Sequence, residues 1–134
     1  MRVASHLSWP GWERFLLVVC AGAHLLLGGA LLFAPDEQVI NAGTRAVFEL
    51  APRWGWGIAC LIAGLAAASL LHRITVVRQM VTWLTVIPLG FAWFAAFVLP
   101  LLITGRGSAI GAVIFPTVYL IFGAVAVRIG LRRR

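Results

Sequence analysis

The sequence predicts an all-α integral membrane protein, a four-helix bundle with both termini in the cytoplasm. Hydrophobic residues make up 62% of the 134 positions and charged residues only 11%. A soluble fold of this size has too small a core to bury so much apolar side chain. Four apolar stretches are long enough to cross a hydrocarbon layer about 30 Å thick, since each helical residue rises about 1.5 Å. The composition therefore indicates the bilayer as the solvent of this chain.

A single membrane domain, 1–134, contains four spans separated by connections of different lengths. The spans are predicted at 15–34, 55–71, 80–103 and 109–127. The remaining segments are an N-terminal segment 1–14, an external loop 35–54, a cytoplasmic loop 72–79, an external turn 104–108 and a basic cytoplasmic tail 128–134. Gly105 and Gly107 make the external turn suitable for a helical hairpin.

The predicted orientation rests on the basic residues, because cytoplasmic loops are enriched in Lys and Arg. Eleven basic residues, all of them Arg, stand against four acidic ones. With four spans, only Arg45, Arg53 and Arg106 fall on the external side. A role in topology and in contact with lipid headgroups is assigned to Arg73, Arg78, Arg128, Arg132, Arg133 and Arg134. These residues flank apolar spans and form no single basic face, so nucleic acid is not expected as a partner.

The first external loop is predicted to contain a short amphipathic helix lying on the outer interface. Asp36 follows Pro35 and is suited to be an N-cap, and Pro52 ends the segment. Apolar residues recur between them at roughly helical spacing, at Val39, Ile40, Val47 and Phe48. A partner-binding loop is the alternative. Trp54 and Trp56 follow and are expected at the headgroup level, whereas Trp93 lies deep in its span.

Two spans carry seams of small residues, which let helix backbones approach closely in lipid. The seam in the second span contains Gly57, Cys60, Gly64 and Ala67. The seam in the fourth span contains Ala112, Pro116, Tyr119 and Gly123. Both are predicted to build the bundle of one chain, and contact between subunits is the alternative.

His24 and Tyr119 form the candidate intramembrane polar site. Both lie near the middle of their spans, and we expect them to face the same interior layer. A histidine at this depth is either a proton relay or a neutral ring hydrogen-bonded to a neighbouring helix. Cys20 and Cys60 are interpreted as small packing residues, with a disulfide between spans or lipidation as alternatives.

Prolines inside the last two spans are predicted to kink them, because proline removes a backbone donor and crowds the preceding turn. They are Pro88, Pro100 and Pro116. A purely structural role is favoured, since prolines are frequent in membrane helices, and a gate or hinge is the alternative.

Several kinds of chemistry have no residues to support them. No acidic residue falls within a predicted span, which disfavours a transporter that couples to protons or cations through a membrane carboxylate. The sequence contains no glycine-rich phosphate loop, no metal-ligand cluster and no catalytic set with a plausible membrane geometry. We therefore expect no enzyme, no catalytic residue, no metal and no cofactor.

Several short motifs carry a resemblance to known proteins. They are Trp12-Glu13-Arg14-Phe15, Phe33-Ala34-Pro35, Pro52-Arg53-Trp54-Gly55-Trp56-Gly57 and Arg132-Arg133-Arg134. In these motifs, and in hydropathy over the whole chain, the sequence resembles small four-span membrane proteins of GC-rich bacteria and their phages, some of them assigned as holins. The resemblance implies a phage lysis pore built by self-association.

The expected function is an assembly or interaction component of a membrane complex or homo-oligomer, acting by helix packing. Its partners would be the lipid bilayer and either further copies of itself or another membrane protein. The expected location is the bacterial inner (cytoplasmic) membrane. A holin-like pore former and a small transporter or channel using His24 are the alternatives.

Overall fold

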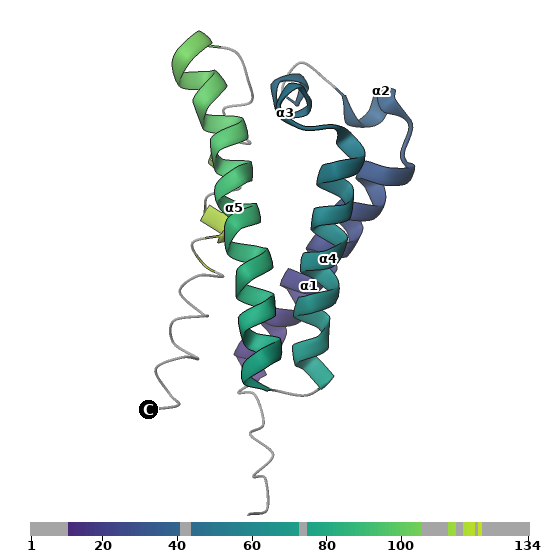
Figure 1. The fold of residues 1–134 in the computed structure, drawn as a ribbon, viewed down its shortest axis with the longest axis vertical. Coiled ribbons are helices and arrows are strands. Elements are labelled where there is room, and N and C mark those ends of the chain that lie inside the picture. The colour runs from purple at the N-terminus through teal and green to yellow at the C-terminus, as the bar shows by residue number, and fades with distance from the viewer. Residues whose placement is uncertain are drawn as a thin grey trace, which may run out of the picture.

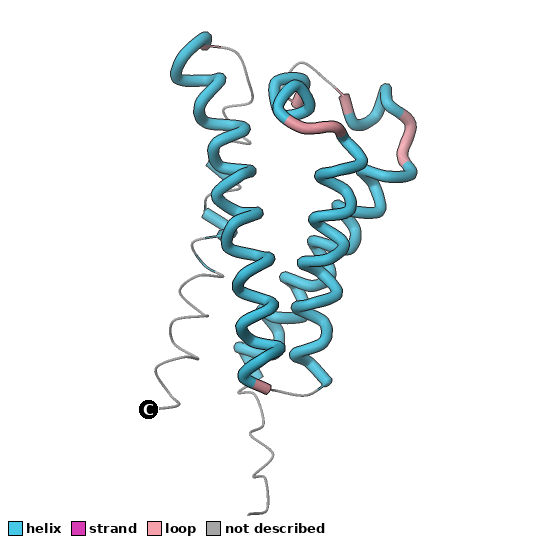
Figure 2. The backbone as a smooth tube through the Cα atoms, in the orientation of Figure 1, coloured by secondary structure: helices cyan, strands magenta, loops and turns pink. Residues whose placement is uncertain are grey.

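A computed structural model describes residues 11–40, 44–72, 75–105, 113–114, 117–119 and 121, and every regular element in these ranges is a helix (Figures 1 and 2). The elements in chain order are α1 (Gly11–Phe33), α2 (Asp36–Val39), α3 (Arg45–Leu50), α4 (Arg53–His72) and α5 (Val76–Thr104). In the described part, α1, α4 and α5 are long and apolar enough to cross a membrane. The all-α class is thus confirmed for these residues, and the first three predicted spans coincide with these helices.

Most of the fourth predicted span, 109–127, lies outside the described residues. Its described pieces at 113–114, 117–119 and 121 are helical. The four-span bundle and its orientation therefore stay predictions. Of the seam predicted in this span, Ala112, Pro116 and Gly123 also lie outside the described residues, and only Tyr119 can be placed.

α1 and α4 form the tightest helix pair. The four small residues of the α4 seam are Gly57, Cys60, Gly64 and Ala67, and all are buried. A Cβ added to Gly64 would lie 2.8 Å from Leu25 Cγ, and one added to Gly57 would lie 2.7 Å from Leu32 Cγ. These distances leave no room for a side chain, so Gly57 and Gly64 of the predicted seam face α1 of the same chain.

Gly28 is the counterpart of this seam on α1, and sequence reasoning did not single it out. A Cβ on Gly28 would lie 2.9 Å from the carbonyl oxygen of Gly57 and 2.9 Å from the backbone nitrogen of Leu61. The neighbouring Gly29 has nothing within 4 Å of such an atom. Close contact of the two backbones therefore requires glycine at position 28, whereas position 29 could hold a larger residue.

α5 contacts α4 through hydrogen bonds at the end of the pair that includes His72 and Thr75. Thr82 Oγ1 lies 3.0 Å from the carbonyl oxygen of Ala66, and Arg78 Nη1 donates to the carbonyl of Ser69 at 3.0 Å. Interhelical hydrogen bonds of this kind join helices where no hydrophobic force acts between them. This end of the α4–α5 pair is therefore closed.

One end of α5 differs from the predicted span, and the other end agrees with it. The helix begins at Val76 and not at residue 80, because the hydroxyl of Thr75 accepts from the backbone N–H of Arg78 at 3.2 Å and caps the first turn. It ends at Thr104 and is capped by Gly105, whose φ of +65° is left-handed and whose N–H donates to the carbonyl of Leu101 at 3.1 Å. The helix continues through Pro88 and Pro100.

The predicted interfacial helix is two short helices, α2 and α3. Asp36 is not the N-cap, since that position is Pro35 and no side-chain capping bond forms there. Asp36 Oδ1 instead forms an ion pair with Arg53 Nη1 at 2.7 Å. Figure 1 shows α3 nearly end-on beside the ends of α4 and α5, so it lies across the long helices. Val47 of α3 is fully buried against the bundle.

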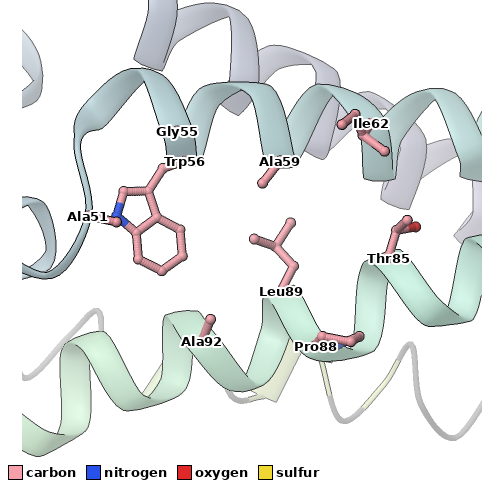
Figure 3. Close-up of a pocket in the computed structure, with 9 residues that line it drawn as sticks. All are labelled: Ala51, Gly55, Trp56, Ala59, Ile62, Thr85, Pro88, Leu89 and Ala92. Carbon is pink, nitrogen blue, oxygen red and sulfur yellow. The ribbon is translucent and has the colours of Figure 1, made fainter.

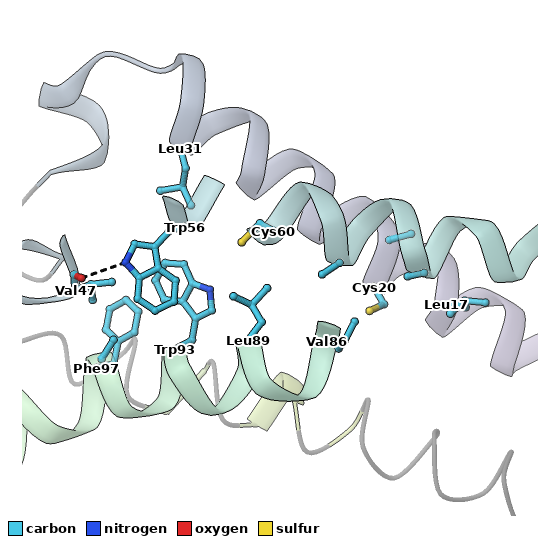
Figure 4. Close-up of a cluster of buried hydrophobic side chains, with 14 of the residues drawn as sticks. Leu17, Cys20, Leu31, Val47, Trp56, Cys60, Val86, Leu89, Trp93 and Phe97 are labelled. Carbon is cyan, nitrogen blue, oxygen red and sulfur yellow. Dashed lines mark hydrogen bonds between the residues drawn. The ribbon is translucent and has the colours of Figure 1, made fainter. Parts of the chain in front are cut away.

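An aromatic cluster fills the space beneath α3 (Figure 4). The rings of Trp56 and Trp93 lie 4.8 Å apart between centroids, and those of Trp93 and Phe97 lie 5.5 Å apart. Trp56 Nε1 donates to the carbonyl of Val47 at 3.2 Å. The indole of Trp56 is buried in this cluster, whereas Trp54 is 62% exposed, and the headgroup level expected for both rings stays a prediction.

The glycine contacts lead to a first prediction. Gly28→Ala should destabilise the protein by about 1–3 kcal/mol, because the new methyl group overpacks the α1–α4 contact. Gly29→Ala is the matched control and should be neutral or stabilising, since alanine is favoured over glycine within helices by about 1 kcal/mol. Thermal unfolding in one detergent measures both variants. Equal stability of the two would contradict the close approach.

Candidate intramembrane polar site

His24 lies on the face of α1 that points into the bundle. Apart from the adjacent pair Cys20 and Ala21, the buried residues of this helix recur every three or four positions, at Glu13, Leu17, Cys20, Ala21, His24, Gly28 and Leu31. This is the spacing of one helical face, so the contact with α4 through Gly28 also turns His24 inward. The imidazole is 4% exposed.

Hydrogen bonds engage both ring nitrogens of His24. Nδ1 lies 2.7 Å from the carbonyl oxygen of Cys20, and Nε2 lies 2.7 Å from the hydroxyl of Tyr119. A carbonyl only accepts, so Nδ1 donates, and in a neutral ring Nε2 then accepts from Tyr119. The two rings meet edge to face, with centroids 5.7 Å apart. The structure thus brings together the two residues of the predicted polar site.

Gly90 of α5 makes room for Tyr119. A Cβ added to Gly90 would overlap the phenol ring of Tyr119. Tyr119 is therefore held between the imidazole of His24 on α1 and the bare backbone of α5. Sequence reasoning missed Gly90, because one glycine in an apolar span carries no signal of the ring that will cover it.

The two cysteines are free thiols within the bundle. Gly64 lies against Leu25, and Gly57 lies against Leu32. This antiparallel register places Cys60 about nine residues, or about 13 Å along the axis, from Cys20. A disulfide needs Cα atoms within about 7 Å, so the two thiols are too far apart to form one. Both side chains are buried, as expected of small packing residues.

Glu13 lies within α1, two residues before the predicted start of the first span. It lies four residues before Leu17 and continues the inward face of the helix. The side chain of Glu13 is 2% exposed. The apolar helix that contains the first predicted span therefore includes a buried acidic residue, and the absence of acidic residues from the span itself stays a prediction.

Two arginines bind backbone carbonyls at helix ends. Arg78, assigned to lipid headgroups, donates to Ser69 in the last turn of α4. Arg53 donates to the carbonyl of Ala34 at 2.8 Å, just beyond the end of α1. The last carbonyls of a helix lack intrahelical donors, so each guanidinium satisfies the end of the preceding span. Arg73, Arg128, Arg132, Arg133 and Arg134 lie outside the described residues.

A groove of about 470 Å³ separates α4 and α5 at the end of the bundle nearest α3 (Figure 3). Its lining residues are mostly small or apolar: Ala51, Gly55, Trp56, Ala59, Ile62, Thr85, Pro88, Leu89 and Ala92. Figure 3 shows Leu89 and Ala59 pointing toward each other across it, with the indole of Trp56 at one end. The hydroxyl of Thr85 bonds to carbonyls of its own helix, Val81 at 3.0 Å and Thr82 at 2.9 Å.

Within the described part of the chain, no three His, Cys, Asp or Glu residues are grouped so that they could hold a metal ion. Comparison with protein families, with curated proteins and with solved structures finds no match to this chain. The arrangement of His24, Tyr119, Cys20 and Gly90 is therefore interpreted from its own geometry. It is a hydrogen-bonded pair, with His24 buried and Tyr119 partly buried, that ties three segments of the bundle together.

The polar pair leads to a second prediction. His24→Leu should cost only about 0.6 kcal/mol, because hydrogen bonds between membrane helices average that value. Gly90→Ala should cost more, since its methyl group displaces the Tyr119 ring. Unfolding in detergent compares the two variants. Combining Gly90→Ala with Tyr119→Ala should recover part of the loss, and strictly additive costs would show that Tyr119 does not occupy this position.

Proposed function

We propose that the protein is a non-enzymatic polytopic membrane protein that acts by helix packing, as an assembly or interaction component of a membrane complex or homo-oligomer. The partners are the bilayer and either further copies of the chain or another membrane protein. We also propose that the protein is a four-span bundle in a bacterial inner membrane.

The engagement of both ring nitrogens of His24 carries this proposal. Nδ1 bonds to the Cys20 carbonyl and Nε2 to Tyr119, each at 2.7 Å. A proton relay needs a ring that can exchange partners along a path, whereas this ring is held by two short bonds, one to its own helix and one to Tyr119. The geometry favours a histidine that positions helices.

Broad apolar faces on the three long helices also support the proposal. Large side chains on these faces are exposed, as in Leu26 of α1, Leu65 of α4 and Phe91 of α5. Such faces meet lipid tails or the helices of another membrane protein, and van der Waals contact is what joins helices there. Gly57 and Gly64 of α4 are already in contact with α1 of the same chain, so a partner would meet other surfaces.

The burial of Glu13 favours a second candidate function, a small transporter or channel using His24. Glu13 and His24 occupy the same inward face of α1, about 16 Å apart along the axis at about 1.5 Å per residue. A buried carboxylate and a buried imidazole on one face are the groups that proton pathways use. Leu17 lies between them and is also buried.

A flux measurement in liposomes tests the proposed function against the second candidate. Purified protein should give no proton or ion flux above that of empty liposomes, and its induction should leave host cells viable. Cross-linking in membranes should give a defined oligomer or complex. Flux that His24→Gln abolishes, with the protein still folded, would establish the transporter, and lysis on induction would establish the holin-like pore.

The orientation gives a further prediction. Reporters fused to either terminus should score as cytoplasmic, because eight of the eleven arginines fall on that side. A cysteine introduced at Thr44 should react with an impermeant reagent in intact cells. Labelling of a cysteine beside Arg134 instead would reverse the assignment.

A further inference from the structure

We propose that α5 is a hinged helix, whose outer half beyond Pro88 tilts toward and away from α4 and is restrained by the His24–Tyr119 pair. The hinge goes beyond the proposed function, because it concerns a motion within one chain and not its assembly with partners. Three features of α5 support it: first turns that are fixed to α4, a weakened turn at Pro88 and an outer half that meets α4 through aromatic rings.

The first turns of α5 are fixed to α4 by hydrogen bonds. Thr82 Oγ1 lies 3.0 Å from the carbonyl oxygen of Ala66, and Arg78 Nη1 donates to the carbonyl of Ser69 at 3.0 Å. Hydrogen bonds are directional, so they set both the spacing and the angle of the two helices here. Figure 1 shows α4 and α5 close together at this end and further apart toward α3. The first turns are therefore the fixed arm of the hinge.

The turn that leads to Pro88 is weaker than a regular helical turn. Pro88 has no backbone N–H to donate to the carbonyl of Leu84, and its ring crowds that carbonyl. Thr85 Oγ1 lies 3.0 Å from the carbonyl oxygen of Val81 and 2.9 Å from that of Thr82. Bonds from a threonine to carbonyls of its own helix often bend the helix, and so does proline. This turn is therefore the pivot of the hinge.

The weakened turn faces the groove beside α4, which sets the direction of the motion. Thr85 and Pro88 are three residues apart, so they lie on one side of α5, and both line the groove. Crowding on that side tilts the outer half away from α4, and release of the tilt brings it back. Gly55 and Ala59 line the opposite wall, and such small residues leave room for the return.

Aromatic rings form the contact between the outer half of α5 and α4. The ring centroids of Trp56 and Trp93 lie 4.8 Å apart, and those of Trp93 and Phe97 lie 5.5 Å apart. Aromatic pairs tolerate a range of offsets, with centroids about 4.5–7 Å apart. Lipid tails are as apolar as these rings, so no hydrophobic force holds the rings together in a membrane. The rings can therefore slide past one another while the fixed arm stays in place.

The His24–Tyr119 pair restrains the outer half close to the pivot. Gly90 lies two residues beyond Pro88, and a Cβ added to it would overlap the phenol ring of Tyr119. The hydroxyl of Tyr119 is in turn held 2.7 Å from Nε2 of His24. A tilt that moves Gly90 against this ring must displace Tyr119 from His24. The hydrogen bond of the pair therefore opposes the motion.

The test measures distances in the full chain, in lipid nanodiscs, by pulsed electron spin resonance. Spin labels attached to a ketone-bearing amino acid leave the native cysteines unchanged. A pair at the exposed positions Leu65 and Leu84 lies beside the fixed arm and should give a narrow distribution. A pair at the exposed positions Ile58 and Leu99 spans the pivot. A bend of about 20° displaces a residue about 16 Å beyond the pivot by about 6 Å, so this distribution should be broader by about that amount.

Two proline variants locate the pivot. Pro88→Ala restores the missing N–H and should narrow the Ile58–Leu99 distribution to the width of the fixed pair. Pro100→Ala is the matched control, because Pro100 lies beyond the labelled Leu99, and it should leave the distribution broad. An unchanged distance between the labels of the fixed pair shows that each variant is folded. A narrow Ile58–Leu99 distribution in the wild type would overturn the hinge, as would equal widths in the two proline variants.

A third variant tests the restraint. Tyr119→Phe keeps the ring against Gly90 but loses the bond to His24. It should broaden the Ile58–Leu99 distribution beyond that of the wild type and leave the fixed pair unchanged. The same distribution in Tyr119→Phe and in the wild type would show that the polar pair does not restrain α5.

Discussion

Close contact between α1 and α4 is the constraint on which the remaining structure depends. Lipid tails are as apolar as the helix surfaces, so helices associate in a membrane mainly through van der Waals contact. Small residues increase this contact because they let the two backbones approach closely. Gly28, Gly57 and Gly64 have this role, because a Cβ at any of the three would overlap the other helix. This contact sets the rotation of α1 and directs His24 inward.

α5 is attached to this pair by a different kind of contact at each end. Hydroxyl and guanidinium groups bond to carbonyls of α4 at one end, and indole and phenyl rings stack at the other. Bonds to carbonyls bring the helices close, whereas rings keep them apart. The lateral groove follows directly from this difference, and α3 covers the aromatic end with its buried Val47.

Arginine side chains stabilise helix ends by hydrogen bonding, in addition to their predicted role in membrane topology. Helix termini near a membrane surface have carbonyls without intrahelical donors, and leaving such groups unpaired in a low-dielectric medium is costly. Arg53 and Arg78 each donate to the end of the span that precedes them. Arg78, on the predicted cytoplasmic side, can therefore follow the positive-inside pattern and stabilise the fold, whereas Arg53, on the predicted external side, serves only the second role.

The sequence by itself determined the helical class, the position of three long apolar helices and the small-residue seam of α4, because hydropathy and residue spacing are properties of local sequence. It also indicated a shared layer for His24 and Tyr119 from their depth. Only the tertiary structure decided that Gly28 meets Gly57, that Gly90 lies under Tyr119 and that Glu13 is buried. These contacts join residues far apart in the chain or depend on the rotation of a helix about its axis, which packing against a neighbour sets.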